Sequence, residues 1–153
     1  MSETLPGDRL RFRRVLAAPP ARVFALWTDP AAIRQWFGGF QTEVVEVSLD
    51  LRAGGAYTIS VRHAAGESRI SGQFLVVEVP VRLVYTWSLA GALGRTVETT
   101  VSVEFRAAAE GTELVLEHGP FADPLVQGLH KQGWEDCFQA LQTLLRTASR
   151  QAP

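Results

Sequence analysis

A stretch near the C-terminus, residues 123–146, repeats its apolar side chains with the period of an α-helix. Asp123 followed by Pro124 is a typical helix start, because an Asp side chain can cap the first turn and proline suits its first position. At 100° per residue, one broad arc is apolar and the opposite arc is polar. The apolar arc holds Val126, Leu129, His130, Gly133, Trp134, Cys137, Phe138, Leu141, Leu144 and Leu145. The stretch therefore predicts one long helix with a single buried face.

Gly133 lies near the middle of that buried face. A glycine inside a helix costs about 1 kcal/mol relative to alanine. Two interpretations follow: either a strand packs very closely against the helix at this point, or space is left open there.

The rest of the chain shows a period of two, which is typical of strands. Candidate strands cover residues 10–16, 43–49, 56–63, 68–79, 81–89, 96–107 and 112–118, with a glycine-rich loop at residues 90–94. Two short helices, residues 21–28 and 31–37, are expected after the first strand. Short turns join the later strands, so they favour an antiparallel meander of about six or seven strands. A sheet and a helix with one apolar face each should bury one another, which predicts an α+β fold.

Length and composition place limits on the function. The chain has 153 residues, 46% hydrophobic and 20% charged, with a net charge of −1. We expect a single domain over residues 9–148, a flexible tail at residues 1–8 and a second tail at residues 149–153. The balanced charge offers no field toward nucleic acid or an anionic membrane, so neither is expected as a partner. A single cysteine, with no apolar leader and no membrane-spanning stretch, favours a cytoplasmic location.

The side chains that could carry chemistry do not form a recognisable pattern. The three histidines, His63, His118 and His130, lack the spacing of a zinc site, which needs three or four converging ligands. Cys137 is in mid-helix, where nothing lowers the pKa of a thiol, so we expect a small buried hydrophobic residue. Glu135 and Asp136 are adjacent on the polar arc and should both be solvated. We therefore expect no catalytic residue, no metal and no cofactor.

Motifs spread along the chain carry a resemblance to a known family. They include Thr28-Asp29-Pro30 with Trp36-Phe37-Gly38, then residues 51–55, then residues 82–87, and finally Gly133-Trp134 in the last helix. In their order and spacing over about residues 10–146, the sequence resembles the START-like (SRPBCC) superfamily, and within it the Aha-type branch. That branch is named after an activator of a heat-shock-protein ATPase. The resemblance implies a helix-grip fold, in which a curved antiparallel sheet wraps the C-terminal helix and a cavity lies between them.

The resemblance and the inward-facing aromatic residues together favour binding of a small hydrophobic or aromatic molecule. The candidate cavity residues are Trp36, Phe37, Tyr57, Ile59, His63, Phe74, Trp87, Val101, His118, Phe121, His130, Gly133, Trp134 and Cys137.

Three alternatives to simple ligand binding stay open. Some superfamily members are polyketide aromatases or cyclases, so an enzyme of dehydratase or cyclase type is one alternative, with a histidine or tyrosine as acid or base. A stress-linked chaperone-interacting protein is another, suggested by the name of the branch. The third is a compact domain in which Gly133 only lets a strand approach. The two edge strands of the expected sheet could also pair in a homodimer.

Overall fold

The computed structural model describes residues 2–5, 8–91 and 97–151 of the chain. Two strands come first, followed by two short helices, six further strands and a long C-terminal helix. The strands are β1 (Ser2–Leu5), β2 (Arg9–Leu16), β3 (Glu43–Leu49), β4 (Ala56–His63), β5 (Gly66–Glu78), β6 (Arg82–Gly91), β7 (Val97–Ala108) and β8 (Gly111–Gly119). The helices are α1 (Pro20–Thr28), α2 (Pro30–Trp36) and α3 (Pro124–Gln151).

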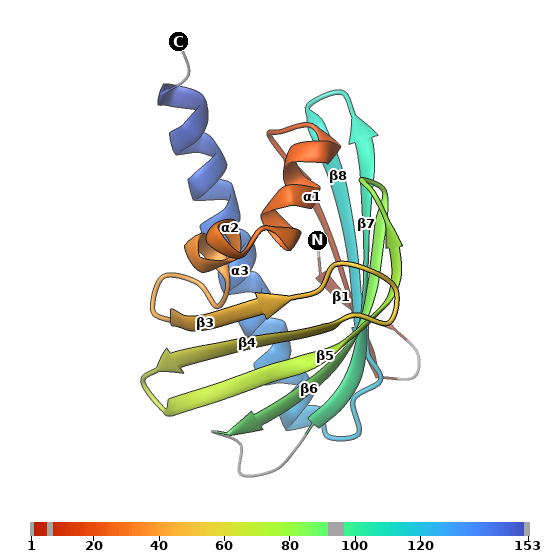
Figure 1. Cartoon of the computed structure of the whole chain (residues 1–153), viewed down its shortest axis with the longest axis vertical. Helices are drawn as coiled ribbons and strands as arrows, with labels where there is room; N and C mark the ends of the chain where they lie inside the picture. Colours follow the sequence, from red (N-terminus) through yellow and green to blue (C-terminus); the bar gives the residue numbers. More distant parts are fainter. Residues whose placement is uncertain (1, 6–7, 92–96, 152–153) are drawn as a thin grey trace.

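The eight strands that the structure describes form one antiparallel sheet in the order β1-β2-β8-β7-β6-β5-β4-β3. The sheet curves around α3, and α1 and α2 cover the upper part of the same concave face (Figure 1). This arrangement confirms the predicted helix-grip α+β fold. The predicted count of about six or seven strands was too low, because it did not include the short strand β1.

The predicted chain ends differ from the structure. Residues 1–8 were expected as a tail, but Ser2–Leu5 form β1 and pair with residues 9–12 of β2. A strand so short carries too little alternation to be recognised from sequence. At the other end α3 extends to Gln151, three residues into the expected tail. The expected glycine-rich loop at 90–94 begins later, because β6 continues through Gly91, and residues 92–96 lie outside the described part.

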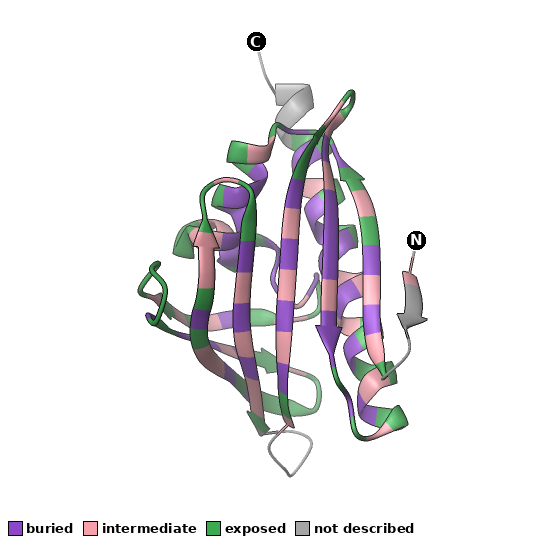
Figure 2. Ribbon diagram, turned by 90° about the vertical axis from the view of Figure 1, so that its right-hand side faces the viewer, coloured by how far each residue is buried: buried purple, intermediate pink, exposed green. Residues whose placement is uncertain are grey.

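The alternation of side chains along the strands matches the predicted facing. Tyr57, Ile59 and Val61 on β4 are buried, whereas Arg62 on the opposite face is exposed. The same banding of buried and less buried residues runs along the neighbouring strands (Figure 2). On β5, whose facing the sequence left uncertain, the inward residues are Ser68, Ile70 and Phe74. The inward faces of the strands and the apolar arc of α3 thus enclose one core.

Helix α3 begins at the predicted residue, and α1 and α2 begin one residue before the predicted starts. The Leu125 N–H donates to Asp123 Oδ1 at 2.8 Å at the start of α3, and the Ala31 N–H donates to Asp29 Oδ1 at 3.0 Å at the start of α2. Between α2 and β3 the loop of residues 37–42 packs directly on α3. A Cβ on Gly39 would lie 2.8 Å from the Cβ of Asp136, and the φ of Gly39 is +84°, so glycine is required there. The loop therefore closes one side of the space between α3 and the sheet.

Candidate functional site

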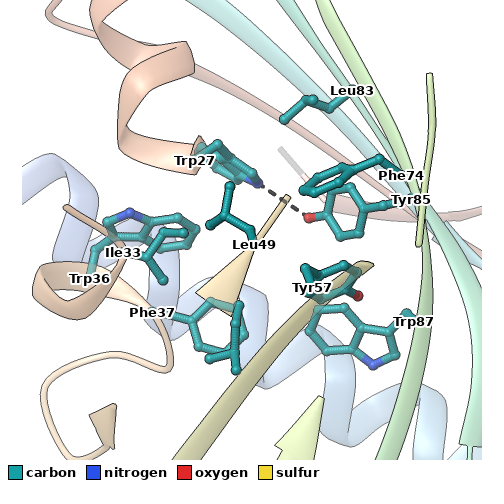
Figure 3. A pocket seen from close by; sticks show the side chains of 11 residues that line it. Trp27, Ile33, Trp36, Phe37, Leu49, Tyr57, Phe74, Leu83, Tyr85 and Trp87 are labelled. Carbon is teal, nitrogen blue, oxygen red and sulfur yellow. Dashed lines mark hydrogen bonds between the residues drawn. The ribbon is translucent and has the colours of Figure 1, made fainter. Parts of the chain in front are cut away.

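Two hollows lie inside the concave face of the sheet, and they differ sharply in size. The first, which we call the aromatic pocket, is enclosed by α1, α2 and strands β3 to β6. Its volume is about 30 Å³, enough for roughly one water molecule. Its walls are Trp27, Ile33, Trp36, Phe37, Leu49, Tyr57, Ile59, Phe74, Leu83, Tyr85 and Trp87. The side chains point toward one another and fill the space (Figure 3).

The second hollow, which we call the open cavity, lies between α3, strands β4 to β6 and the loop of residues 37–42. Its volume is about 550 Å³. It reaches the surface beside Leu129 and Gln132, both of which are exposed. The walls are Phe37, Gly38, Thr42, Val61, His63, Ala65, Ser68, Ile70, Trp87, Leu89, Leu129, His130, Gln132, Gly133, Trp134, Asp136 and Cys137. Most of this surface is apolar.

Gly133 is one of the residues that leave the cavity open. A Cβ built on Gly133 would meet no atom of the described residues within 4 Å. None of the described strands therefore packs against this point of α3, and the second of the two sequence interpretations is the correct one. Small neighbours extend the same effect, because Gly38, Ala65 and Ser68 also line the cavity.

Two hydrogen-bonded pairs, each an indole with an imidazole, lie at the inner side of the cavity. Trp87, His130 and Trp134 line the cavity, and His118 lies behind them in the core. The Trp87 N–H donates to His130 Nε2 at 3.3 Å, and the Trp134 N–H donates to His118 Nδ1 at 3.0 Å. An indole can only donate, so both of these ring nitrogens must be unprotonated. The remaining nitrogens then carry the protons: His130 Nδ1–H donates to the Val126 carbonyl at 2.9 Å. His118 Nε2–H lies 2.6 Å from Thr99 Oγ1.

Burial reinforces the neutral state of both histidines. It lowers the pKa of His118 well below its ordinary value, and the repulsion that two protonated rings, His118 and His130, would exert on one another and the cation of Arg9 act in the same direction. Burial also lowers the pKa of His130, against the opposing effect of its hydrogen bond to Val126. Since both nitrogens of each ring already have partners, neither histidine has a free site from which to move a proton on a ligand.

The other candidate acid, base and nucleophile groups are also engaged. The Tyr57 hydroxyl donates to the Thr86 carbonyl at 2.6 Å, and burial raises the pKa of Tyr57. Burial raises the pKa of the Cys137 thiol to about 12, so it is uncharged at neutral pH. The Gly38 N–H points at the Cys137 sulfur at 3.2 Å, which ties the loop to α3.

His63 lies at the mouth of the cavity, in the β4–β5 hairpin. The Ala65 N–H donates to His63 Nδ1 at 3.2 Å, and His63 Nε2 lies 2.9 Å from Ser68 Oγ. An Nδ1 that accepts an N–H leaves the proton on Nε2, so the ring donates to the serine hydroxyl. This pair provides polar groups at one side of an otherwise apolar cavity.

The structure divides the predicted site residues into three groups. Seven line the open cavity: Phe37, His63, Trp87, His130, Gly133, Trp134 and Cys137. Four others, Trp36, Tyr57, Ile59 and Phe74, belong to the aromatic pocket, which Phe37 and Trp87 also touch. Val101, His118 and Phe121 line neither hollow and are buried in the core.

Several wall residues carried no signal in the sequence. The small residues Ala65 and Ser68, and Thr42 in the loop, have no pattern that marks a cavity. Asp136, expected to be solvated on the polar arc, has an exposed side-chain hydrogen bond, but the residue is half-buried and also lines the cavity. The reason is the loop of residues 37–42, which reaches across to α3 at Gly39 and makes a second wall around this part of the helix.

Two further observations concern metals and membranes. Within residues 2–5, 8–91 and 97–151, no group of three His, Cys, Asp or Glu side chains could hold a metal ion. None of the helices in the described ranges has an apolar stretch long enough to cross a membrane.

Solved structures similar to this chain come from several bacteria. A protein of Chromobacterium violaceum is 24% identical, with a TM-score of 0.80, and the match covers 90% of this chain and 97% of that one. The AHSA1 protein of Silicibacter pomeroyi is 26% identical, with a TM-score of 0.80 and coverage of 92% and 99%. A protein of Rhizobium leguminosarum is 27% identical, with a TM-score of 0.77 and coverage of 91% and 94%. Among curated proteins, none matches the chain significantly.

The comparison with family models agrees with the fold. The model described as "Activator of Hsp90 ATPase homolog 1-like protein" matches residues 17–146, from the end of β2 to the body of α3. The matched region contains α1, α2, the six strands β3 to β8, most of α3, and every residue of the open cavity. The chain therefore belongs to the Aha-type family of START-like proteins.

Proposed function

We propose that the protein binds a small hydrophobic or aromatic molecule in the open cavity between the sheet and α3. The observation that carries the proposal is the cavity itself, about 550 Å³ in volume with mostly apolar walls. Small-molecule sites typically have volumes of about 300–1,000 Å³ and apolar walls with a few polar groups. The His63–Ser68 pair and Asp136 are such polar groups.

The composition of the walls supports binding of a flat or elongated apolar molecule. The rings of Trp87 and Trp134 lie 5.7 Å apart between centroids and both face the cavity. Indole rings supply large contact areas with little loss of side-chain freedom. Both rings are also held by hydrogen bonds to histidines, so they are positioned before a ligand arrives.

Binding without chemistry is favoured by the state of the surrounding groups. His118 and His130 use both ring nitrogens in internal hydrogen bonds, and the Tyr57 hydroxyl is bonded to a carbonyl. A general acid or base must reach its substrate by a hydrogen bond. Side chains with their hydrogen-bonding capacity already used are better suited to shaping a cavity than to moving protons.

Tryptophan fluorescence provides the test, because Trp87 and Trp134 line the cavity. The protein is titrated with fatty alcohols, flavonoids and polyketide-like aromatic compounds. We expect saturable changes in emission for at least one class. The change should disappear in Gly133→Leu, whose side chain would enter the cavity.

Gly128→Leu is the matched control for that variant. Gly128 lies on the same helix, an added Cβ there also meets nothing within 4 Å, and it lines a different, surface hollow. Both substitutions replace a helical glycine by leucine, so they share the gain in helix propensity. Loss of binding in Gly133→Leu alone supports the proposal. Equal binding in both variants, or no binding by the parent protein, contradicts it.

A further inference from the structure

We propose that the ligand of the open cavity carries a protonated amine, which Asp136 binds, on an aliphatic or aromatic body. This inference rests on the proposed function and adds the chemical class of the ligand.

The walls of the cavity, as far as the structure describes them, contain one formally charged group. Among the described residues that line it, Asp136 is the one carboxylate, and there is no Lys or Arg. The adjoining hollow, about 460 Å³ in volume, is bordered by the same Asp136 and likewise has no described Lys or Arg. Asp136 thus lines both hollows, and its side-chain hydrogen bond lies at the surface.

The carboxylate of Asp136 can accept further hydrogen bonds, as from a cationic group. Gln132 Nε2 donates to Asp136 Oδ1 at 3.0 Å, which orients the carboxylate from one helical turn away. The loop approaches α3 closely at this point, because Gly39 lies against the Cβ of Asp136. A carboxylate can accept about four hydrogen bonds, and a protonated amine offers three donors. Hydrogen bonds between two charged groups are shorter and stronger than those between neutral ones.

A ligand with a carboxylate is disfavoured by the same geometry. It would have to leave water for an apolar space without a cationic partner on the described walls, close to the charge of Asp136. The histidines do not supply that cation, because the two indoles donate to ring nitrogens of His118 and His130 and the Ala65 N–H donates to His63 Nδ1. Burial of an unpaired charge beside a like charge is unfavourable on both counts.

The aromatic walls favour the same class of ligand. Cations are attracted to the faces of aromatic rings, with Trp giving the strongest effect. Trp87 and Trp134 line the cavity together with Asp136. A ligand that reaches Asp136 with its basic group therefore meets one negative charge, while the rest of the cavity offers it the indole rings and apolar residues such as Ile70 and Leu89.

The test uses three probes with one body and different head groups: decylamine, decanol and decanoate. At pH 7 the amine is protonated and the acid is ionised. Binding to the intact protein is measured by isothermal titration calorimetry and tryptophan fluorescence, below the aggregation concentration of each probe. We expect decylamine to bind about tenfold more tightly than decanol, the effect of one charge-assisted hydrogen bond, and decanoate to bind most weakly.

Variants assign that preference to one residue. Asp136→Asn keeps the shape of the side chain and an oxygen for Gln132, and it should weaken decylamine binding about tenfold while leaving decanol unchanged. Glu110→Gln removes the same charge from the β7–β8 turn, outside the cavity walls, and should change none of the three affinities.

The outcomes separate this inference from the proposed function. Equal affinities for the three head groups, or tighter binding of decanoate, overturn the assignment of an amine while the cavity still binds apolar molecules. An unchanged decylamine affinity in Asp136→Asn overturns the role of Asp136. Failure of all three probes to bind counts against both proposals. The comparison of head groups on the parent protein remains decisive if the variant does not fold.

Discussion

The aromatic pocket and the open cavity share the concave face of one sheet, yet one is filled and the other is not. In the aromatic pocket, Trp27 from α1 and Trp36 from α2 project onto Tyr85 and its neighbours, and about 30 Å³ remains. In the open cavity the covering helix presents Gly133, and about 550 Å³ remains. The difference lies in the size of the side chains that face the sheet.

This comparison also separates two roles for aromatic residues. Around the aromatic pocket they pack ring on ring, as in Trp27 and Trp36 with centroids 4.5 Å apart, and Trp27 donates to the Tyr85 hydroxyl at 3.3 Å. Such contacts give stability and a unique arrangement. Trp87 and Trp134, in contrast, also line the open cavity, so part of their surface can contact another molecule there.

Replacing one leucine by alanine at each hollow should give the largest difference between the aromatic pocket and the open cavity. Leu83 and Leu89 lie on β6 with the same facing, but Leu83 is fully buried at the aromatic pocket and Leu89 is half-buried at the open cavity. Leu83→Ala should lower the free energy of unfolding by about 3–5 kcal/mol, because it creates a void in a packed core. Leu89→Ala should cost about 1 kcal/mol, since its surroundings are already open.

Urea denaturation of both variants at pH 7.5 measures the difference. The contrast between the filled pocket and the open cavity is supported if the free energy of unfolding falls much more in Leu83→Ala than in Leu89→Ala. Similar losses at the two positions would mean that the open cavity is as closely packed as the aromatic pocket.

Acidification should weaken the region around the open cavity before the aromatic pocket. Because the folded-state pKa values of His118 and His130 are lowered, the unfolded chain binds protons first as the pH falls. Their contribution is fully present above the unfolded pKa of about 6.5 and is lost as the pH falls through the folded values. Tyr57 and Tyr85 in the aromatic pocket have raised pKa values and stay neutral.

The pH effect is measured as the free energy of unfolding at pH 7.5, 6.5 and 5.5. His118→Asn removes one titrating ring but keeps an acceptor for the Trp134 N–H, so stability should decline less steeply with acid than in the parent protein. A decline of the same size in both proteins would show that His118 is not responsible.

Sequence reasoning predicted the architecture because local periodicity and global fold agree here. The start of α3, its buried face and the facing of β4, β6 and β7 all followed from the spacing of apolar residues. Gly133 was also informative, since an unfavourable residue on a buried helix face requires an explanation, and the structure supplies open space.

The division of the aromatic residues between two hollows could not be predicted in the same way. Whether Tyr57 or Phe74 faces a void depends on α1 and α2, which bring Trp27 and Trp36 across the sheet from distant parts of the chain. The place of Asp136 on the cavity wall did not follow from the sequence, because helical periodicity describes one helix alone and does not show that the loop packs on α3 at Gly39. Packing between separate elements decided both cases.

The most direct test of the central claim is a crystal structure of the protein soaked with 2-bromonaphthalene, in which bromine marks the bound molecule by its anomalous signal. The account predicts a bromine peak in the open cavity, beside Gly133 and between the sheet and α3, and none in the aromatic pocket. A cavity without the compound at saturating concentration, or a peak among Trp27, Tyr57 and Tyr85 instead, would contradict it.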